Sequence, residues 1–151
     1  MKKIVLFSFL VAALMSASTA QVYEYHQITV VESIVPMGIG RSRIISSNEA
    51  LNVDEFTTSR TDGKDSDQGD VKRGDAKISK FEETKLLNFY SGVGINFQNI
   101  ASNDALITSK INKLVSEGWE LAFVVGAVES KGSKDDKAGI FITRYIFRKK
   151  K

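Results

Sequence analysis

The chain of 151 residues contains no cysteine, a single histidine and a single proline. Without cysteine it has no disulfide, no thiol nucleophile and no lipid-modified cysteine, so the folded state must rest on its hydrophobic core. The lone histidine, His26, excludes a multi-histidine metal site. The Gly-Val-Gly sequence at residues 92–94 lacks the third glycine of a dinucleotide fingerprint. We therefore predict no catalytic residue, no metal and no cofactor.

The first 20 residues have the pattern of a cleavable export signal. Two lysines precede an apolar stretch at residues 4–15, and a Ser-Thr-Ala sequence ends the segment at Ala20. The apolar stretch is too short for a membrane-spanning helix, which needs about 20 residues. We predict that the mature chain begins at Gln21, works in the periplasm or outside the cell, and has no stable membrane insertion after cleavage.

The charge of the mature chain is nearly balanced. Lys2 and Lys3 belong to the signal, which leaves 19 basic residues against 18 acidic ones. Nucleic acids and anionic lipid surfaces attract proteins with a strong excess of positive charge. We therefore expect no nucleic-acid partner, and we interpret the basic run at residues 148–151 as a solvated chain end.

Residues 22–31 are rich in Tyr, Ile, Val and Thr, which favour a β-strand. A proline and glycines break this pattern, and residues 41–45 favour a second strand, so we predict a hairpin with a glycine-rich tip. Glycine amides and two guanidinium groups at this tip suit an anion such as phosphate or carboxylate. Turn chemistry alone accounts for the same residues, and that alternative stays open. The candidate anion-binding residues are Gly38, Gly40, Arg41 and Arg43.

A polar stretch at residues 57–77 has almost no apolar residue in its middle part. Such a segment buries too little surface to offset the entropy of ordering, so we predict a mobile loop. Its aspartates have the carboxylate oxygens that a calcium site needs. Their spacing, however, puts Gly69 and Ala76 where an EF-hand needs ligands. We therefore interpret the stretch as solvated; the aspartates are Asp62, Asp65, Asp67 and Asp70.

The clearest helical pattern follows three candidate N-caps and carries one apolar stripe. The caps are Ser102, Asn103 and Asp104, and the stripe is Ile107, Ile111, Leu114 and Val115. Gly118 is predicted to be the left-handed residue that ends the helix, which brings Trp119 against Leu114. Immediately before the helix, residues 93–97 alternate as a strand does.

Two further strands are predicted near the C-terminus. After Glu120, residues 121–125 form an apolar run typical of a strand buried on both faces, so we predict a central place in the sheet for residues 120–128. Residues 139–147 alternate, with Phe141, Thr143, Tyr145 and Phe147 on one face, and complete a hairpin. The elements together predict one α+β domain at residues 21–151, with an antiparallel sheet of about four to six strands and one main helix on one face.

Three segments carry a family pattern. They are Tyr-Glu-Tyr at residues 23–25, Glu-Gly-Trp-Glu-Leu at residues 117–121 and Arg-Tyr-Ile-Phe-Arg-Lys at residues 144–149. Together they resemble the bacterial domain-of-unknown-function family numbered 4177. The resemblance implies a compact strand, helix, strand, strand unit with no established activity, and it supplies no functional residues. This chain differs from the short form of the family by its export signal and by a long insert between Pro36 and Asn99.

These observations predict a non-enzymatic binding or protein-interaction module, whose partner is an unknown protein or a second copy of the chain. An open sheet edge pairs readily with an extended segment. The alternative is a small hydrolase of envelope or extracellular polymer, which needs two carboxylates about 5–10 Å apart. Its candidate acids are Glu82, Glu83, Glu117 and Glu120. We expect His26 to be a surface or edge residue rather than a catalytic base.

Overall fold

Strands β1 (Tyr23–Ser33) and β7 (Ile140–Lys150) pair antiparallel along their whole length in the inner part of a sheet. The computed structural model describes residues 21–33, 41–60, 63, 66–128 and 140–151. β2 (Arg43–Ser46) and β3 (Glu82–Lys85) continue the sheet beside β1, and β6 (Glu120–Val128) flanks β7. The strand order is β3-β2-β1-β7-β6, and each neighbouring pair is antiparallel.

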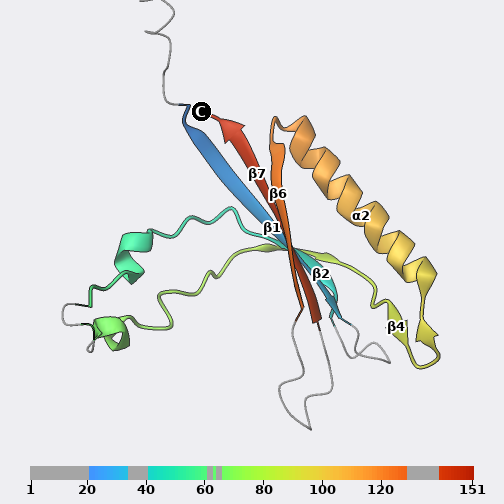
Figure 1. Cartoon of the computed structure of the whole chain (residues 1–151), viewed down its shortest axis with the longest axis horizontal. Coiled ribbons are helices and arrows are strands. Elements are labelled where there is room, and N and C mark those ends of the chain that lie inside the picture. The colour runs from blue at the N-terminus through green and yellow to red at the C-terminus, as the bar shows by residue number, and fades with distance from the viewer. Residues whose placement is uncertain (1–20, 34–40, 61–62, 64–65, 129–139) are drawn as a thin grey trace, which may run out of the picture.

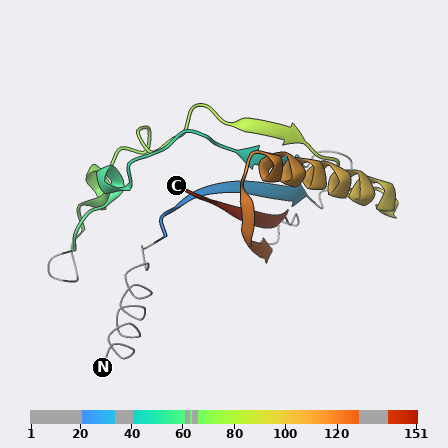
Figure 2. The same cartoon turned by 90° about the horizontal axis from the view of Figure 1, so that it is seen from above.

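One long helix, α2 (Phe97–Ser116), runs along the sheet (Figure 1). Figure 2 shows α2 on one face of the sheet, with no described helix on the other. The predicted α+β class, with an antiparallel sheet and one main helix packed on it, is confirmed. The smaller elements are the 3-10 helices η2 (Val53–Phe56) and η3 (Asp67–Asp70) and a ribbon of β4 (Tyr90–Ser91) and β5 (Gly94–Ile95).

The hydrophobic core lies between α2 and the sheet face that carries Ile28 and Val30 of β1. Phe147 of β7 is fully buried there, and Tyr145 packs against the same cluster, as the alternation of β7 predicts. The other members of the core are Ile44, Leu86, Ile107 and Leu114. We call this face the helix side and the opposite face of the sheet the far side.

The start of α2 differs from the prediction. The helix begins at Phe97, and the Asn96 side chain caps it by accepting a hydrogen bond from the Asn99 amide at 3.2 Å. The predicted strand at residues 93–97 is reduced to Gly94–Ile95. Ser102, Asn103 and Asp104 all lie inside the helix, and Asn103 is fully buried. The prediction of these caps was wrong because the Asn96 side chain caps the helix and Asn103 makes its hydrogen bonds to Leu87 and Glu32 instead.

The end of α2 agrees with the prediction. Gly118 has a φ of +89°, and its amide donates to the Val115 carbonyl at 3.0 Å. The Trp119 amide donates to the Leu114 carbonyl at 3.1 Å, which completes a Schellman motif. The indole packs against the hydrophobic core, so this tight turn leads the chain directly from α2 into β6.

The predicted central position of β6 is wrong: β6 is an edge strand. Both hydrogen-bonding edges of β7 are already used, one by β1 and one by β6, so β7 takes the inner position. The β6–β7 register shifts between Leu121 and Phe123, which places a β-bulge at Ala122. Among the described residues, the backbone of the apolar run is therefore paired with β7 alone.

The predicted hairpin of the N-terminal region is present as the antiparallel pair β1–β2, with Val30 opposite Ile44. Its glycine-rich tip, with Gly38 and Gly40, lies outside the described residues. In the polar stretch 57–77 the structure places η3, whose side chains are exposed. Among the described residues, no helix is long and apolar enough to cross a membrane.

Candidate functional site

Exposed apolar side chains concentrate on residues 123–128 of β6, which we call the β6 surface. The exposed fractions are 59% for Phe123, 53% for Val124, 51% for Val125 and 64% for Val128. Gly126 and Ala127, between them, are also exposed. Single exposed apolar residues are ordinary on protein surfaces, but a continuous run of them marks an interaction site.

The β6 surface is exposed on both faces for two different reasons. Pairing with β7 sets Phe123 opposite Ile146, and Val124 opposite the core-packed Tyr145, so these neighbours on β6 face opposite sides of the sheet. On the helix side, the buried residues of α2 pack in the core and leave Val124 uncovered. On the far side, no described helix covers the sheet (Figure 2). Phe123 and Val125 are exposed there.

The opposite edge of the sheet is chemically different. β3 has the sequence Glu-Glu-Thr-Lys, and charged residues on an edge strand prevent it from pairing with other chains. Glu83 forms an ion pair with Arg43, and Glu82 forms one with Lys110 at 3.1 Å. The β6 surface carries no charged residue, so within the described residues the edge at β6 lacks the charges that protect the edge at β3.

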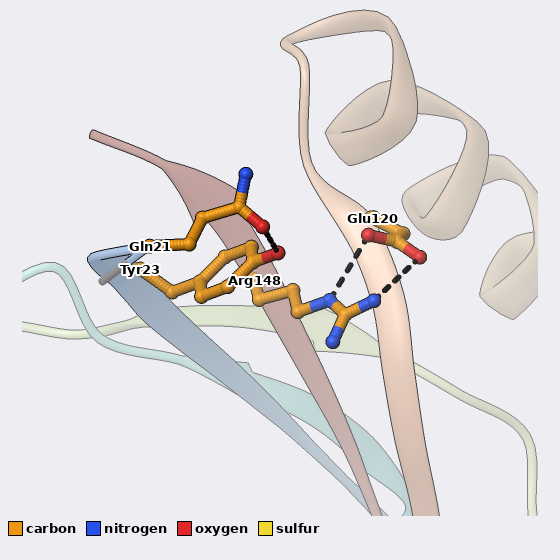
Figure 3. A network of polar contacts seen from close by, with 4 residues as sticks. All are labelled: Gln21, Tyr23, Glu120 and Arg148. Atoms are coloured by element: carbon orange, nitrogen blue, oxygen red, sulfur yellow. Dashed lines mark hydrogen bonds and ion pairs between the residues drawn. The ribbon is translucent and has the colours of Figure 1, made fainter. Parts of the chain in front are cut away.

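A polar cluster anchors the start of β6 beside this surface (Figure 3). Arg148 of β7 makes a bidentate ion pair with Glu120, with both N···O distances 3.0 Å, and its guanidinium lies 5.0 Å from the centroid of the Tyr23 ring. The Tyr23 hydroxyl donates to Gln21 at 2.6 Å. The Arg148 hydrogen bond lowers the pKa of Glu120, so this carboxylate stays ionised. The cluster fixes β6 to the sheet before the bulge and ends the apolar run at one side.

A second candidate site is a pocket of about 160 Å³ between α2 and the helix side of β1, β2 and β3. The His26 ring lies on its wall, 5.4 Å from the Trp119 ring, and its Nε2 is 3.3 Å from the Ser46 hydroxyl. Of the two places expected for His26, a surface or an edge, the edge is excluded because His26 belongs to the inner strand β1, where it is half-buried. The remaining lining residues are Asn48, Glu82, Lys110, Lys113, Leu114 and Glu117.

The charges in this pocket limit its chemistry. Burial, with the nearby charge of Lys110 adding to it, lowers the pKa of His26, so the ring is mostly neutral at pH 7. The hydrogen bond from Lys110 lowers the pKa of Glu82, which holds that carboxylate ionised. A neutral histidine beside a serine hydroxyl resembles part of a catalytic triad, but no described carboxylate hydrogen-bonds the other ring nitrogen. The pocket is therefore suited to holding a small polar molecule more than to activating Ser46.

Of the four residues predicted to bind an anion, the structure describes two, so the predicted anion site stays a prediction. Arg41 is exposed, and Arg43 is engaged by Glu83 across β2 and β3. Gly38 and Gly40 lie outside the described residues. Within the described part of the chain, no group of three His, Cys, Asp or Glu residues is arranged to hold a metal ion.

Sequence reasoning anticipated docking at an open sheet edge but did not identify β6 as that edge, and it did not foresee the contact between His26 and Ser46. The contact between Ser46 and His26 joins residues 20 apart in the chain, and no local motif announces it. The β6 surface was visible as an apolar run, but its exposure depends on the strand order.

Comparisons of this chain with protein-family models, with curated proteins and with solved structures found no match. The resemblance to family 4177 therefore stays a prediction.

Proposed function

We propose that the chain is an exported, non-enzymatic protein-interaction module that binds its partner through the β6 surface. The observation that carries the proposal is the uncharged, apolar and exposed run of residues 123–128 on an unprotected sheet edge. An added strand satisfies the backbone groups of such an edge, and side chains of the partner cover the apolar residues. Export is supported by the signal-like pattern at residues 1–20.

The contacts at the start of β6 also support this function. Arg148 and Glu120 fix the start of the strand, and the Schellman motif at Gly118 fixes its connection to α2. A strand that is held in place before binding loses less conformational entropy when a partner adds to it.

The hydrolase alternative has weaker support. Of its four candidate acids, Glu82 and Glu117 line the His26 pocket, whereas Glu83 is engaged by Arg43 and Glu120 by Arg148. A general acid needs a raised pKa, but the pKa values of Glu82 and Glu120 are both lowered by their basic partners. The lowered pKa values of Glu82 and Glu120 do not suit a general acid, and we therefore favour binding over hydrolysis.

Site-directed photo-cross-linking in the producing cell tests the proposed function. A photoreactive phenylalanine analogue is placed at Val125 and, as a matched control, at Val53, which is 71% exposed on η2 far from the sheet edge. We expect adducts from position 125 that map by mass spectrometry to one extended segment of a polypeptide, and none from position 53. An absence of adducts at position 125 would refute the proposal. N-terminal sequencing of the exported chain, expected to begin at Gln21, tests the compartment.

A further inference from the structure

The side chains of β6 become smaller along the strand, so they are complementary in size to those of a second β6 strand that runs in the opposite direction. Residues 123–127 read Phe-Val-Val-Gly-Ala, with the larger side chains in the first half and the smaller ones in the second. We infer, on the basis of the proposed function, that the β6 surface pairs antiparallel with β6 of a second copy of this chain, about a two-fold axis at Val125.

The pleat of the strand restricts where such an axis can lie. After the bulge at Ala122, Phe123, Val125 and Ala127 face the far side, while Val124 and Gly126 face the helix side. Directly opposite residues of an antiparallel pair lie on the same face. An axis through a residue satisfies this condition, whereas an axis between two residues would set far-side side chains against helix-side ones.

Among the axes through a residue, Val125 gives the best fit of side chains. Phe123 then lies opposite Ala127 of the second copy, Val124 lies opposite its Gly126, and the two Val125 residues face each other. On either side of the Val125 pair a larger side chain meets a smaller one, which lets both layers pack without overlap. An axis at Gly126 would instead place two glycines at the centre, where no side-chain contact forms.

The charges near β6 are compatible with this pairing. A two-fold axis at Val125 would bring a charged side chain close to the axis against the same charge of the other copy. The β6 surface has no charged residue, and Glu120, before the bulge, is paired with Arg148. The Glu-Glu-Thr-Lys edge of β3 lacks this compatibility, which leaves β6 as the edge through which two copies meet.

The size of the contact predicts a reversible dimer. Six residues of one strand cover less than the roughly 800 Å² per partner of a standard interface. We therefore expect a dissociation constant in about the micromolar range.

Sedimentation velocity of the exported chain, over about 1 μM to 1 mM, tests self-association. We expect monomer to give way to dimer, and we expect Val125→Lys to raise the dissociation constant roughly tenfold or more, because it sets two like charges against each other at the axis. Val53→Lys makes the same change at a more exposed valine outside the sheet and should leave association unchanged. Circular dichroism checks that both variants are folded. A monomer at every concentration would overturn the inference.

The absence of cysteine allows a direct test of the register. Opposite residues in an antiparallel pair have Cα atoms about 4.5–5.5 Å apart, within the range of about 4.4–6.8 Å that a disulfide spans. Val125→Cys should therefore form a disulfide-linked dimer on mild oxidation, much faster than Val124→Cys or Val53→Cys. Equal rates for the three variants would overturn the assigned axis.

The two proposals fail in different ways. If the chain is monomeric but position 125 cross-links to another polypeptide in the cell, the self-pairing is wrong and the proposed function stands. If position 125 yields no adduct at all, the proposed function fails as well.

Discussion

Substituting Asn103 tests whether a buried amide holds α2 to the sheet. Asn103 is fully buried on the helix. Its Oδ1 accepts a hydrogen bond from the Leu87 amide at 2.8 Å, and its Nδ2 donates to the Leu87 carbonyl at 2.7 Å and to Glu32 at 3.2 Å. One side chain therefore joins α2 to β1 and to the segment that follows β3.

The expected loss of stability follows from these contacts. Asn103→Ala leaves the amide and carbonyl of Leu87 without their partner, and each unsatisfied buried group costs about 1–3 kcal/mol. Leu87 is 40% exposed, so water can reach part of this region and the lower half of that range applies. We expect the free energy of unfolding to fall by about 2–4 kcal/mol, a large part of the roughly 5–15 kcal/mol of a typical domain.

Urea unfolding followed by circular dichroism measures this loss, and Asn112→Ala provides the control. Asn112 is exposed on the same helix, so its replacement reports only the higher helix propensity of alanine, a gain of up to about 0.7 kcal/mol. The difference between the two variants isolates the hydrogen bonds of Asn103. A difference below about 1 kcal/mol would refute the reasoning, because it would be no larger than the net effect of one ordinary hydrogen bond.

Three further changes test other parts of the structure. Gly118→Ala should destabilise by about 1–2 kcal/mol in urea unfolding, because the residue has a φ of +89°; Gly69→Ala, with open space around it, should not. Phe147→Ala should cost about 3–5 kcal/mol in the same assay, since the ring is fully buried in the core, and a loss below about 1 kcal/mol would contradict that placement. Burial of the ring and the nearby charge of Lys110 lower the pKa of His26 below 6.5. The neutral ring therefore contributes to the stability of the folded chain above pH 6.5, and this contribution should be lost as the pH falls through the lowered pKa. The melting temperature of His26→Gln, measured between about pH 7.5 and 5, should lack this part of the decline.

Local sequence patterns predicted the elements of this fold better than their boundaries. Gly118 and Trp119 marked the helix exit because a Schellman motif depends on neighbouring residues alone. The helix start was missed because Asn103 has the composition of a cap but makes its hydrogen bonds to Leu87 and Glu32, which are distant in the chain. A pattern of this kind gives no information about which partner a side-chain amide will find.

The candidate sites depended even more on long-range contacts. His26 was expected on a surface or edge, yet strand pairing places it on the inner strand, where Ile28 and Ser46 lie opposite each other and the Ser46 hydroxyl approaches the ring. Trp119 reaches the same pocket only because α2 ends above it. These three side chains meet through topology, and no spacing along the chain predicts that they do.

The wrong prediction of a central position for β6 has a different origin, and it bears on the function proposed for this strand. An apolar run predicts burial of a strand on both faces, but the pattern does not say which molecule supplies the cover. Within one copy of the chain, the described elements leave Val124 and Val125 about half exposed, one on each face. Pairing of two β6 strands at Val125 would give β6 a neighbouring strand on both sides, which is the central place in a sheet that its apolar run predicts. The apolar run and the edge position of β6 no longer disagree if a second copy of the chain completes the sheet. The Val125→Cys cross-link tests whether two copies pair in this way.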